Sequence, residues 1–377
     1  MEYQKTEELK TEKLELNMGP QHPSMHGVLN LMLEVDGEIV NRVTPNIGYL
    51  HRCNEKIGEN VTYTQFIPYT DRFDYLASMN NGLGFCLAVE RLGGIAVPER
   101  AEYIRVIMAE LNRIASHLIA LGTHGLDIGS WTPVLYCFRE REIILDLFEA
   151  ACGARLTYSY MALGGVTKDL PEGFVQKALD FLDYFEPKLK EYNELLSYNK
   201  IFIDRTAKLG VMSVKDAIGY GVTGPNLRAA GFNWDLRKDE PYSVYNRLDF
   251  KVALGDARFG VLGDAWNRYF VRIMEMEESV KIVRQALKQL PQGEYRTKVS
   301  RALRLPAGEI YSATENPKGE LGFYIISAGE TRPARLKIRG PSFNNLSILP
   351  EITKGIFIAD LISIVGSIDL VLGEVDR

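Results

Sequence analysis

The histidines of this chain are the first residues that could carry chemistry, because all five lie within its first third. They are His22, His26, His51, His117 and His124. The first two flank a short turn in the segment GPQHPSMHG, whose two glycines and two prolines predict a fixed, non-helical backbone. An imidazole titrates near neutral pH, so a stiff loop that presents one is a candidate proton-donating site. Taken alone, a loop histidine is more often structural or merely exposed.

Two other segments place polar groups at the expected ends of helices. In YTDRFDY (69–75), Asp71 is expected to cap a helix and Tyr75 to be an ordinary residue of its first turn. In GTHGLDIGSWTP (122–133), Asp127 is expected in a glycine-rich loop, either in an Asx turn or as the partner of a histidine. On the residues alone, we favour the turn.

The four cysteines do not predict a metal site. Cys53, Cys86, Cys137 and Cys152 are far apart and form no CxxC pair. The first 14 residues are charged and lack the apolar run of a signal peptide, so we expect a reducing cytoplasm. The chain also lacks GxGxxG, Walker and HExxH patterns, which leaves nucleotide binding and zinc hydrolysis without support.

The periodicity of apolar residues predicts the elements that position these side chains. Residues 28–50 alternate apolar and polar positions around Asp36-Gly37, which predicts a strand, a tight turn and a second strand. Helical spacing begins at Asp71, and Pro98 can start a second long helix. Further helices are predicted over about 136–152, 172–196 and 262–290, and strand-like alternation returns over 296–313 and 321–340.

Together these patterns predict an α+β fold, mainly α, with a central bundle of long helices and small β elements near both ends. The expected regions are a flexible N-terminal tail over 1–14, an N-terminal β region over 15–70, a helical bundle over 71–290, and a C-terminal α/β region over 291–377 that packs back on the bundle.

The composition is that of a globular protein of one or two domains, since 377 residues that are 46% hydrophobic can bury a large core. The net charge is −5, and basic residues are scattered among acidic ones, so nucleic acid is not an expected partner. The most apolar stretch, Ile356–Leu372, is broken by Asp360 and Asp369. It is shorter than the roughly 20 residues of a membrane-spanning helix, so we expect a buried helix or strand in a chain that is soluble by itself.

Seven segments, in this order, resemble the D subunit of NADH-quinone oxidoreductase, the quinone-site subunit of respiratory complex I. They are MGPQHPSMHGVL (18–29), GYLHR.NEKIGEN (48–60), YTDRFDYLA (69–77), LNRIASHL..LGTHGLDIG (111–129), WDLRK..PY (234–242), KGELGFY (318–324) and GSIDLVLGEVDR (366–377). The resemblance runs from about residue 15 to the end of the chain. An ordered set of segments is far more specific than any one of them.

The resemblance implies roles for individual residues. His26 and Tyr75 correspond to the family's histidine and tyrosine that approach the quinone headgroup, and Asp127 to the aspartate that pairs with that histidine. His22 and Arg52 belong to the same neighbourhood, with Arg52 beside the terminal iron–sulfur cluster. Thr157 also falls near this cluster, at a position where the family typically has histidine.

These residue types suit quinone reduction, which consumes two electrons and two protons. A histidine and a tyrosine can each hydrogen-bond a carbonyl oxygen and then give up a proton. The chain lacks thiolates for a [4Fe-4S] cluster, so the resemblance implies that a small cluster-bearing partner supplies the electrons. It further implies contacts with the C subunit, the ferredoxin-like subunit and the H subunit of the membrane part, and a peripheral place on the cytoplasmic face of the bacterial inner membrane or a thylakoid-type membrane.

Three alternatives stay open beside an NADH-fed, proton-pumping complex. The large subunits of [NiFe] hydrogenases share the fold, but they carry two CxxC pairs where this chain has His51-Arg52-Cys53 and GEVDR (373–377). Nickel is therefore not expected, and Cys53, which replaces a family glycine, is read as a free thiol. The same role in a ferredoxin- or deazaflavin-fed complex is not distinguished by this chain. A scaffold that has lost the site is disfavoured by the intact His26, Tyr75 and Asp127.

Overall fold

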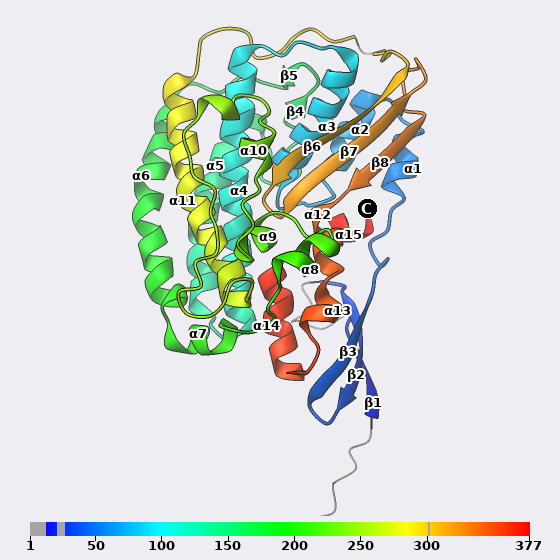
Figure 1. Ribbon diagram of the computed structural model, residues 1–377. Coiled ribbons are helices and arrows are strands. Elements are labelled where there is room, and N and C mark those ends of the chain that lie inside the picture. Colours follow the sequence, from blue (N-terminus) through cyan, green and yellow to red (C-terminus); the bar gives the residue numbers. More distant parts are fainter. Residues whose placement is uncertain (1–12, 21–26, 301) are drawn as a thin grey trace, which may run out of the picture.

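The computed structural model describes residues 13–20, 27–300 and 302–377, and it has the mainly helical α+β fold that the sequence predicts. Four long helices stand side by side and form a bundle on one side of the molecule (Figure 1). They are α4 (Glu99–Asp127), α5 (Thr132–Cys152), α6 (Phe174–Tyr192) and α11 (Ala265–Gln289). A three-stranded sheet lies on the other side, and the N-terminal strands form an extension below it (Figure 1).

Helix α4 is the centre of the bundle, and it packs against both α5 and α11. Pro98 precedes it, as predicted, and Glu99 and Glu102 lie in its first turn, where the helix dipole favours negative charge. The apolar residues Ile107 and Ile114 are 0% exposed, and so are the polar residues Glu110, Arg113 and His117. Since almost every face of α4 is covered, its charged side chains must find their partners inside the protein.

The three-stranded sheet covers helix α3 (Ser78–Gly93). Its antiparallel strands are β6 (Gly308–Asn316), β7 (Gly319–Ser327) and β8 (Arg335–Arg339). A Cβ at Gly84 of α3 would lie 2.8 Å from Thr314 Oγ1 and 3.3 Å from Phe323 Cε2. Glycine at this position therefore lets the helix approach the sheet closely.

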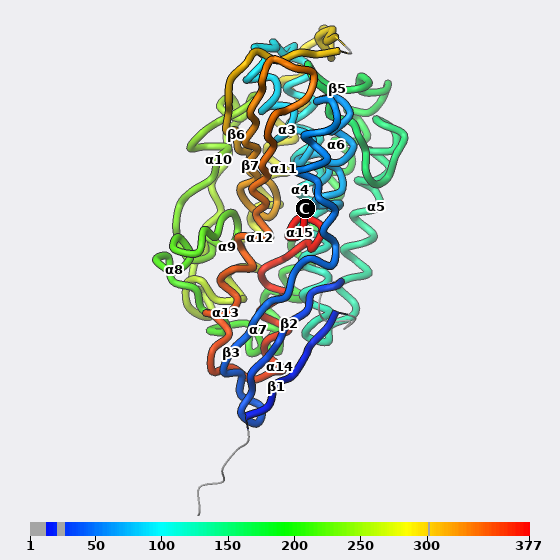
Figure 2. Tube along the Cα trace, turned by 90° about the vertical axis from the view of Figure 1, so that its right-hand side faces the viewer, coloured from blue at the N-terminus to red at the C-terminus, as the bar shows by residue number. Residues whose placement is uncertain are grey.

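The first strands and the last helices of the chain share a second hydrophobic core. The strands are β1 (Lys13–Met18), β2 (Asn30–Asp36), β3 (Ile39–Asn46) and β9 (Ile356–Phe357), in the order β1-β2-β3-β9. The helices are α13 (Leu349–Ile352), α14 (Ile358–Ile368) and α15 (Leu372–Asp376). The predicted pair of strands around Asp36-Gly37 is confirmed. Figure 2 shows the N-terminal strands at the lower end of the molecule, where β3 contacts α13 and β9.

Shorter elements complete the fold. They are α1 (Asn54–Gly58), α2 (Tyr63–Thr70), β4 (Met161–Ala162), β5 (Gly165–Val166), a π-helical turn (Asn193–Ser197), α7 (Lys200–Thr206), α8 (Val214–Gly219), α9 (Pro225–Ala229), α10 (Leu236–Asp239), a 3₁₀ turn (Tyr245–Arg247) and α12 (Pro341–Leu346). No helix within the described ranges is long and apolar enough to cross a bilayer.

Some stretches differ from the predicted secondary structure. Helix α2 lies where β structure is predicted, although Thr62 and Gln65 form a capping box that the sequence displays. In the stretch 296–313, the strand begins only at Gly308, directly after a segment that contains Pro306, which has no N–H to donate to a sheet.

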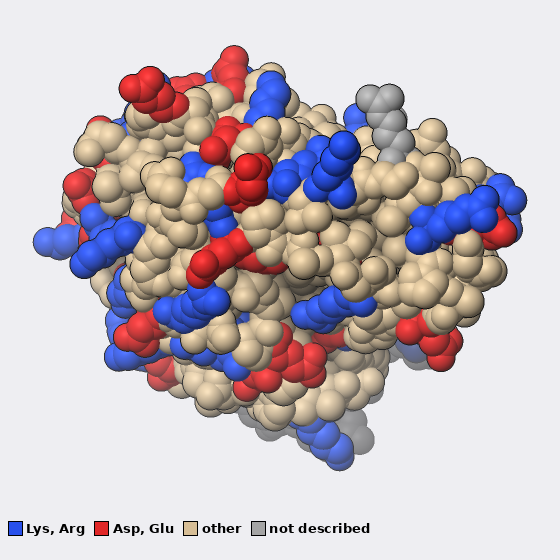
Figure 3. All heavy atoms as spheres, turned by 90° about the horizontal axis from the view of Figure 1, so that it is seen from above, with Lys and Arg blue, Asp and Glu red and all other residues tan. Residues whose placement is uncertain are grey.

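The face seen from the top of the molecule carries both signs of charge (Figure 3). Lysine and arginine side chains are interspersed with aspartate and glutamate on this face. It does not present the continuous basic surface that binding to a nucleic acid backbone requires.

Candidate functional site

Tyr75 lies in a turn between α2 and α3 that hydrogen bonds hold in one shape. The Oδ1 atom of Asp74 accepts a hydrogen bond from the backbone N–H of Leu76 at 3.0 Å. The side-chain amide of Asn81 donates to the backbone oxygen of Asp74, also at 3.0 Å. Asp74 is 1% exposed, whereas Tyr75 is 42% exposed. The carboxylate is therefore enclosed by the protein while part of the neighbouring tyrosine stays accessible.

Asp71 does not cap the start of a helix, so this prediction is wrong, and it instead follows the last residue of α2 as its C-terminal cap. Helix α3 begins at Ser78, with Ala77 at the cap position. The Asp71 carboxylate instead accepts hydrogen bonds from Ser159 N at 2.6 Å and from Ser159 Oγ at 2.9 Å. Two donors satisfy this carboxylate better than the single bond of an N-cap. The contact also ties the loop after α5, which carries Thr157, to the turn that carries Tyr75.

A buried lysine stands behind the Tyr75 turn. Lys318 follows the end of β6, and its Nζ lies 3.2 Å from Asp74 Oδ2 and 3.5 Å from Asp369 Oδ2. It also donates a hydrogen bond to Ser116 Oγ on α4 at 3.1 Å. Lys318 itself is 0% exposed. We call Lys318, Asp74 and Asp369 the Lys318 cluster.

The electrostatics of the Lys318 cluster extend to Tyr75. Burial by itself would lower the pKa of Lys318, but Asp369 and Asp74 outweigh it, so its pKa is raised and the ammonium is retained. Burial and the charge of Asp74 raise the pKa of Tyr75, while Lys318 acts in the opposite direction. Tyr75 is thus a protonated phenol at neutral pH whose anion would be stabilised by a nearby cation.

Asp127 lies at the end of α4 rather than in a loop, so the prediction of a glycine-rich loop from residue 122 is wrong. A Cβ at Gly122 would lie 3.1 Å from Val134 Cα, so glycine here lets α4 continue close against α5. Asp127 also lies against the backbone of α14, because a Cβ at Gly366 would overlap its Oδ2 atom. The carboxylate therefore stands next to the last turn of α14.

The last turn of α14 joins the two halves of this site. Asp369 follows that turn, in the left-handed conformation with φ 61°. Arg272 on α11 donates hydrogen bonds to the backbone oxygens of Ser367 and Ile368, both at 2.9 Å, and its Nε lies 3.5 Å from Asp369 Oδ2. Asp127 on one side and the Lys318 cluster on the other are consequently fixed by one short stretch of chain.

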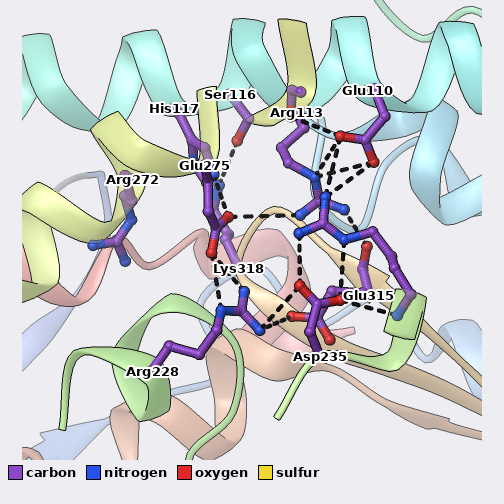
Figure 4. Close-up of polar contacts among 12 residues, drawn as sticks. Glu110, Arg113, Ser116, His117, Arg228, Asp235, Arg272, Glu275, Glu315 and Lys318 are labelled. Carbon is purple, nitrogen blue, oxygen red and sulfur yellow. Dashed lines mark hydrogen bonds and ion pairs between the residues drawn. The ribbon is translucent and has the colours of Figure 1, made fainter. Parts of the chain in front are cut away.

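A larger buried network adjoins the Lys318 cluster (Figure 4). Its members are 2% exposed or less, and they are Arg113, Arg228, Arg237, Glu110, Asp235, Glu275 and Glu315. Arg228 connects Glu275, at 2.6 Å, with Glu315, at 2.8 Å, and the Nε2 atom of His117 lies 2.8 Å from Glu275. Burial lowers the pKa of His117 to about 4, so its imidazole is neutral and donates to Glu275. We call this set the arginine network.

Comparisons with known proteins agree over nearly the whole chain. A family model described as the 49 kDa subunit of respiratory-chain NADH dehydrogenase matches residues 127–305 and 296–377. The D subunit of NADH-quinone oxidoreductase from Bacillus cytotoxicus is 52% identical over 369 residues, which are 98% of this chain and 100% of that protein. The protein of the same name from Bacillus thuringiensis strain Al Hakam is 53% identical over the same shares. The chain belongs to this 49 kDa subunit family. As a member it is a subunit of the respiratory-chain oxidoreductase complex I, as the sequence predicts.

In this member of the 49 kDa subunit family, the expected site residue Arg52 lies beside the C-terminus. Its backbone N–H donates to the backbone oxygen of Arg377 at 3.3 Å, and its side chain is exposed. The Asp376 carboxylate accepts from the backbone N–H groups of Gly48 and Leu50 at 2.8 and 2.6 Å. The last helix therefore fixes the stretch that presents Arg52 at the surface.

The structure describes two of the remaining residues singled out from the sequence, Thr157 and Cys53, but not the two histidines of the first loop. Thr157 adopts the left-handed conformation, with φ 52°, in the loop tied to Asp71. His22 and His26 lie outside the described residues, so their roles stay predictions. Cys53 is a free, exposed thiol, also with positive φ. A glycine, which the family usually has there, would adopt this conformation without strain.

The residues of the Lys318 cluster were not predicted from the sequence. One signal was available, because Asp369 interrupts the most apolar stretch of the chain and a charge inside such a stretch needs a partner. Lys318 and Asp74 carry no such local signal, since neither interrupts a long apolar stretch. Their pairing joins positions 244 residues apart (318 minus 74) and depends on the tertiary fold.

Proposed function

We propose that this chain forms, with a cluster-bearing partner subunit, the site where a proton-pumping NADH:quinone oxidoreductase reduces quinone. His26 and Tyr75 give protons to the two carbonyl oxygens, and Asp127 pairs with His26. The observation that carries this proposal is the position of Tyr75. Its phenol is partly open to a ligand and lies beside the buried charges of the Lys318 cluster.

The residues of this chain would handle protons, and the partner would supply electrons. The raised pKa of Tyr75, due first to burial, keeps its proton in place until a quinone oxygen becomes basic enough to take it. Asp127 would hold the proton-carrying tautomer of His26 and stabilise its cationic form. In this proposal the electrons come from a [4Fe-4S] cluster of the small cluster-bearing subunit, since the four cysteines of this chain are far apart in sequence.

Exposed apolar side chains support docking of partners. Trp131, Leu135 and Phe138 follow one another at helical spacing at the start of α5, and they are 71%, 69% and 42% exposed. Large apolar groups in such an arrangement are typical of interaction surfaces. The proposed partners are the small cluster-bearing subunit, the C subunit, the ferredoxin-like subunit and the H subunit of the membrane part, at the cytoplasmic face of the bacterial inner membrane or a thylakoid-type membrane.

The relatives favour NADH as the electron donor of the complex. Several Bacillus proteins at 52–53% identity are named as the D subunit of NADH-quinone oxidoreductase. This supports an NADH-fed complex over the ferredoxin- or deazaflavin-fed alternative.

The test is quinone reduction by the assembled complex with Tyr75→Phe or His26→Ala. Each change should slow NADH:quinone turnover on the order of 10²-fold, because one proton donor is lost. NADH oxidation by ferricyanide, which takes electrons before the quinone site, should persist in both variants. Tyr220→Phe, at an exposed tyrosine that follows α8, is the matched control and should behave like the wild type. Unchanged quinone turnover in both site variants would exclude this assignment.

A further inference from the structure

Glu374 is a buried carboxyl group that the proposed reaction does not yet use. It lies on α15 and is 0% exposed. Its Oε2 atom accepts hydrogen bonds from the backbone N–H of Ser342, at 2.9 Å, and from the Ser342 hydroxyl. Its Oε1 atom has no hydrogen-bond partner among the residues that the structure describes. A buried carboxylate oxygen without a donor is costly, whereas a protonated carboxyl group is tolerated.

Close backbone packing brings Glu374 next to the Tyr75 turn. A Cβ at Gly373 would lie 2.7 Å from the backbone oxygen of Phe73 and 3.1 Å from that of Arg72. Only glycine lets α15 approach this turn so closely. On the other side, a Cβ at Gly340 would lie 2.9 Å from Glu374 Cγ. The Glu374 side chain is thus packed against the start of α12, while the residue before it, Gly373, packs against the turn that carries Tyr75.

Glu374 adds to a surplus of carboxyl groups around the Lys318 cluster. The described charged groups in this region are Asp74 before α3, Lys318 before β7, Asp369 after α14, Arg272 on α11 and Glu374 on α15, all 8% exposed or less. Two cations thus face three carboxyl groups, and Ser116 and Ser342 add neutral hydroxyls. Burial and then the charge of Asp74 raise the pKa of Glu374 to about 7, against the opposing effect of Lys318.

We propose that Glu374 stores the proton that replaces the one Tyr75 gives to quinone. This inference rests on the proposed function. When a quinone oxygen receives its electrons from the partner's cluster, the O–H bond of Tyr75 breaks and its proton moves to that oxygen. Asp74, whose charge acts on both groups, passes the carboxyl proton of Glu374 to the tyrosinate, and the Glu374 carboxylate later regains a proton that enters from solvent. Lys318 stabilises the Tyr75 phenolate and the Glu374 carboxylate while they exist, because its positive charge lowers the pKa of both groups.

The pH dependence of quinone reduction by the assembled complex tests this role. Glu374 is protonated below about pH 7 and ionised above it, so the quinone turnover of the wild type should fall as the pH rises through that value. Ser342→Ala removes one donor to the carboxylate, which raises the pKa of Glu374 and moves the fall to higher pH by about one unit. Glu374→Gln has no proton to give, so turnover at about pH 6 should drop ten-fold or more, and its ratio to the wild type should approach one at about pH 9.

The controls separate this inference from the proposed function. Glu351→Gln, at a surface glutamate paired with Lys354, should leave the pH profile unchanged. If Tyr75→Phe slows quinone reduction but neither Ser342→Ala nor Glu374→Gln changes the shape of the profile, the store is excluded and the proposed function stands. If Tyr75→Phe has no effect, the proposed function fails whatever the other variants do. Should Glu374→Gln prevent assembly, judged by the set of co-purified subunits, the shift in Ser342→Ala decides alone.

Discussion

At the scale of single residues, the position of Asp127 depends on a glycine in a distant part of the chain. No side chain larger than hydrogen fits at Gly366 without meeting Asp127, and His124 Cδ2 would lie only 3.2 Å from a Cβ there. The carboxylate is therefore held between two helices, α4 and α14. Asp127 and Gly366 are far apart in the sequence, so local spacing does not predict this contact. A residue fixed in this way is suited to orient a second group rather than to move itself.

This geometry leads to a prediction for Asp127→Asn. The amide has nearly the same shape, so it should fit against Gly366 and leave assembly of the complex intact. It carries no negative charge and cannot stabilise a protonated His26, so quinone turnover should fall by about ten-fold or more. The set of co-purified subunits and the NADH:quinone activity of the purified complex measure the two effects separately. Failure to assemble would instead make Asp127 a residue required for folding of the α4 terminus.

At the scale of elements, the arginine network fixes the helices around the Lys318 cluster. Arg228 on α9 bonds Glu275 on α11 and Glu315 on β6, so three elements meet at one guanidinium. Removing one partner of a buried ion pair leaves the other partner charged and unpaired. The resulting loss in the free energy of unfolding is far larger than the net contribution of the intact pair.

Arg228→Met should therefore lower the free energy of unfolding of the chain by about 3–5 kcal/mol. The matched control is Arg284→Met. Arg284 is exposed and pairs with Asp183 and Glu186 at the surface, so its loss should cost about 1 kcal/mol or less. Denaturant unfolding of the two purified variants compares the costs directly. Equal destabilisation would mean that burial does not set the importance of these ion pairs.

His117 makes the stability of the same network depend on pH. Burial lowers its pKa to about 4, below the ordinary value of 6.5, so the unfolded chain binds a proton that the folded chain does not. The contribution of neutral His117 to the free energy of unfolding is fully present above pH 6.5 and is lost as the pH falls toward 4. Between pH 7 and 5 the loss should be about 2 kcal/mol. His117→Gln keeps an N–H donor for Glu275 but does not titrate, so its unfolding free energy should fall less over this interval. An equal fall in both proteins would contradict the assignment.

The elements were predictable where the signal is local. The spacing of Ile107, Leu111 and Ile114, together with Pro98, predicts α4 and its start. The cap at Asp71 was wrong because a distant serine, Ser159, binds that carboxylate. Local patterns contain no information about such a competitor. The same limit applies to the arginine network, in which His117 meets Glu275 across 158 positions.

At the scale of the whole molecule, the site lies where the C-terminal segment packs against the stretch 48–76. Asp376 holds the backbone around Leu50, Gly373 packs on the Tyr75 turn, and Asp369 faces Lys318. The C-terminal segment therefore contributes to the stretch before Arg52, to the Tyr75 turn and to the Lys318 cluster.

The loop that carries Thr157 gives a prediction for the assembled complex. The resemblance seen in the sequence implies that this position lies near the partner's terminal cluster and that the family typically has histidine there, and we adopt this placement as a proposal. An imidazole there would take up a proton when the cluster is reduced, because added negative charge raises its pKa, and the potential would then fall with pH. Threonine has no such proton to exchange. The midpoint potential of the terminal cluster should therefore be nearly independent of pH between about pH 6 and 8.

The buried histidines of α4 do not replace that group. His117, with a pKa of about 4, takes up no proton in this interval. His124 packs on Phe202 of α7, at the end of the bundle opposite β4, which follows the Thr157 loop (Figure 1). Redox titration of the complex at several pH values measures the slope, and Thr157→His is the matched variant. Histidine tolerates the left-handed conformation found here better than a β-branched residue, so it should fit and introduce pH dependence. A wild-type slope approaching roughly 59 mV per pH unit would instead show that another proton acceptor lies beside the cluster.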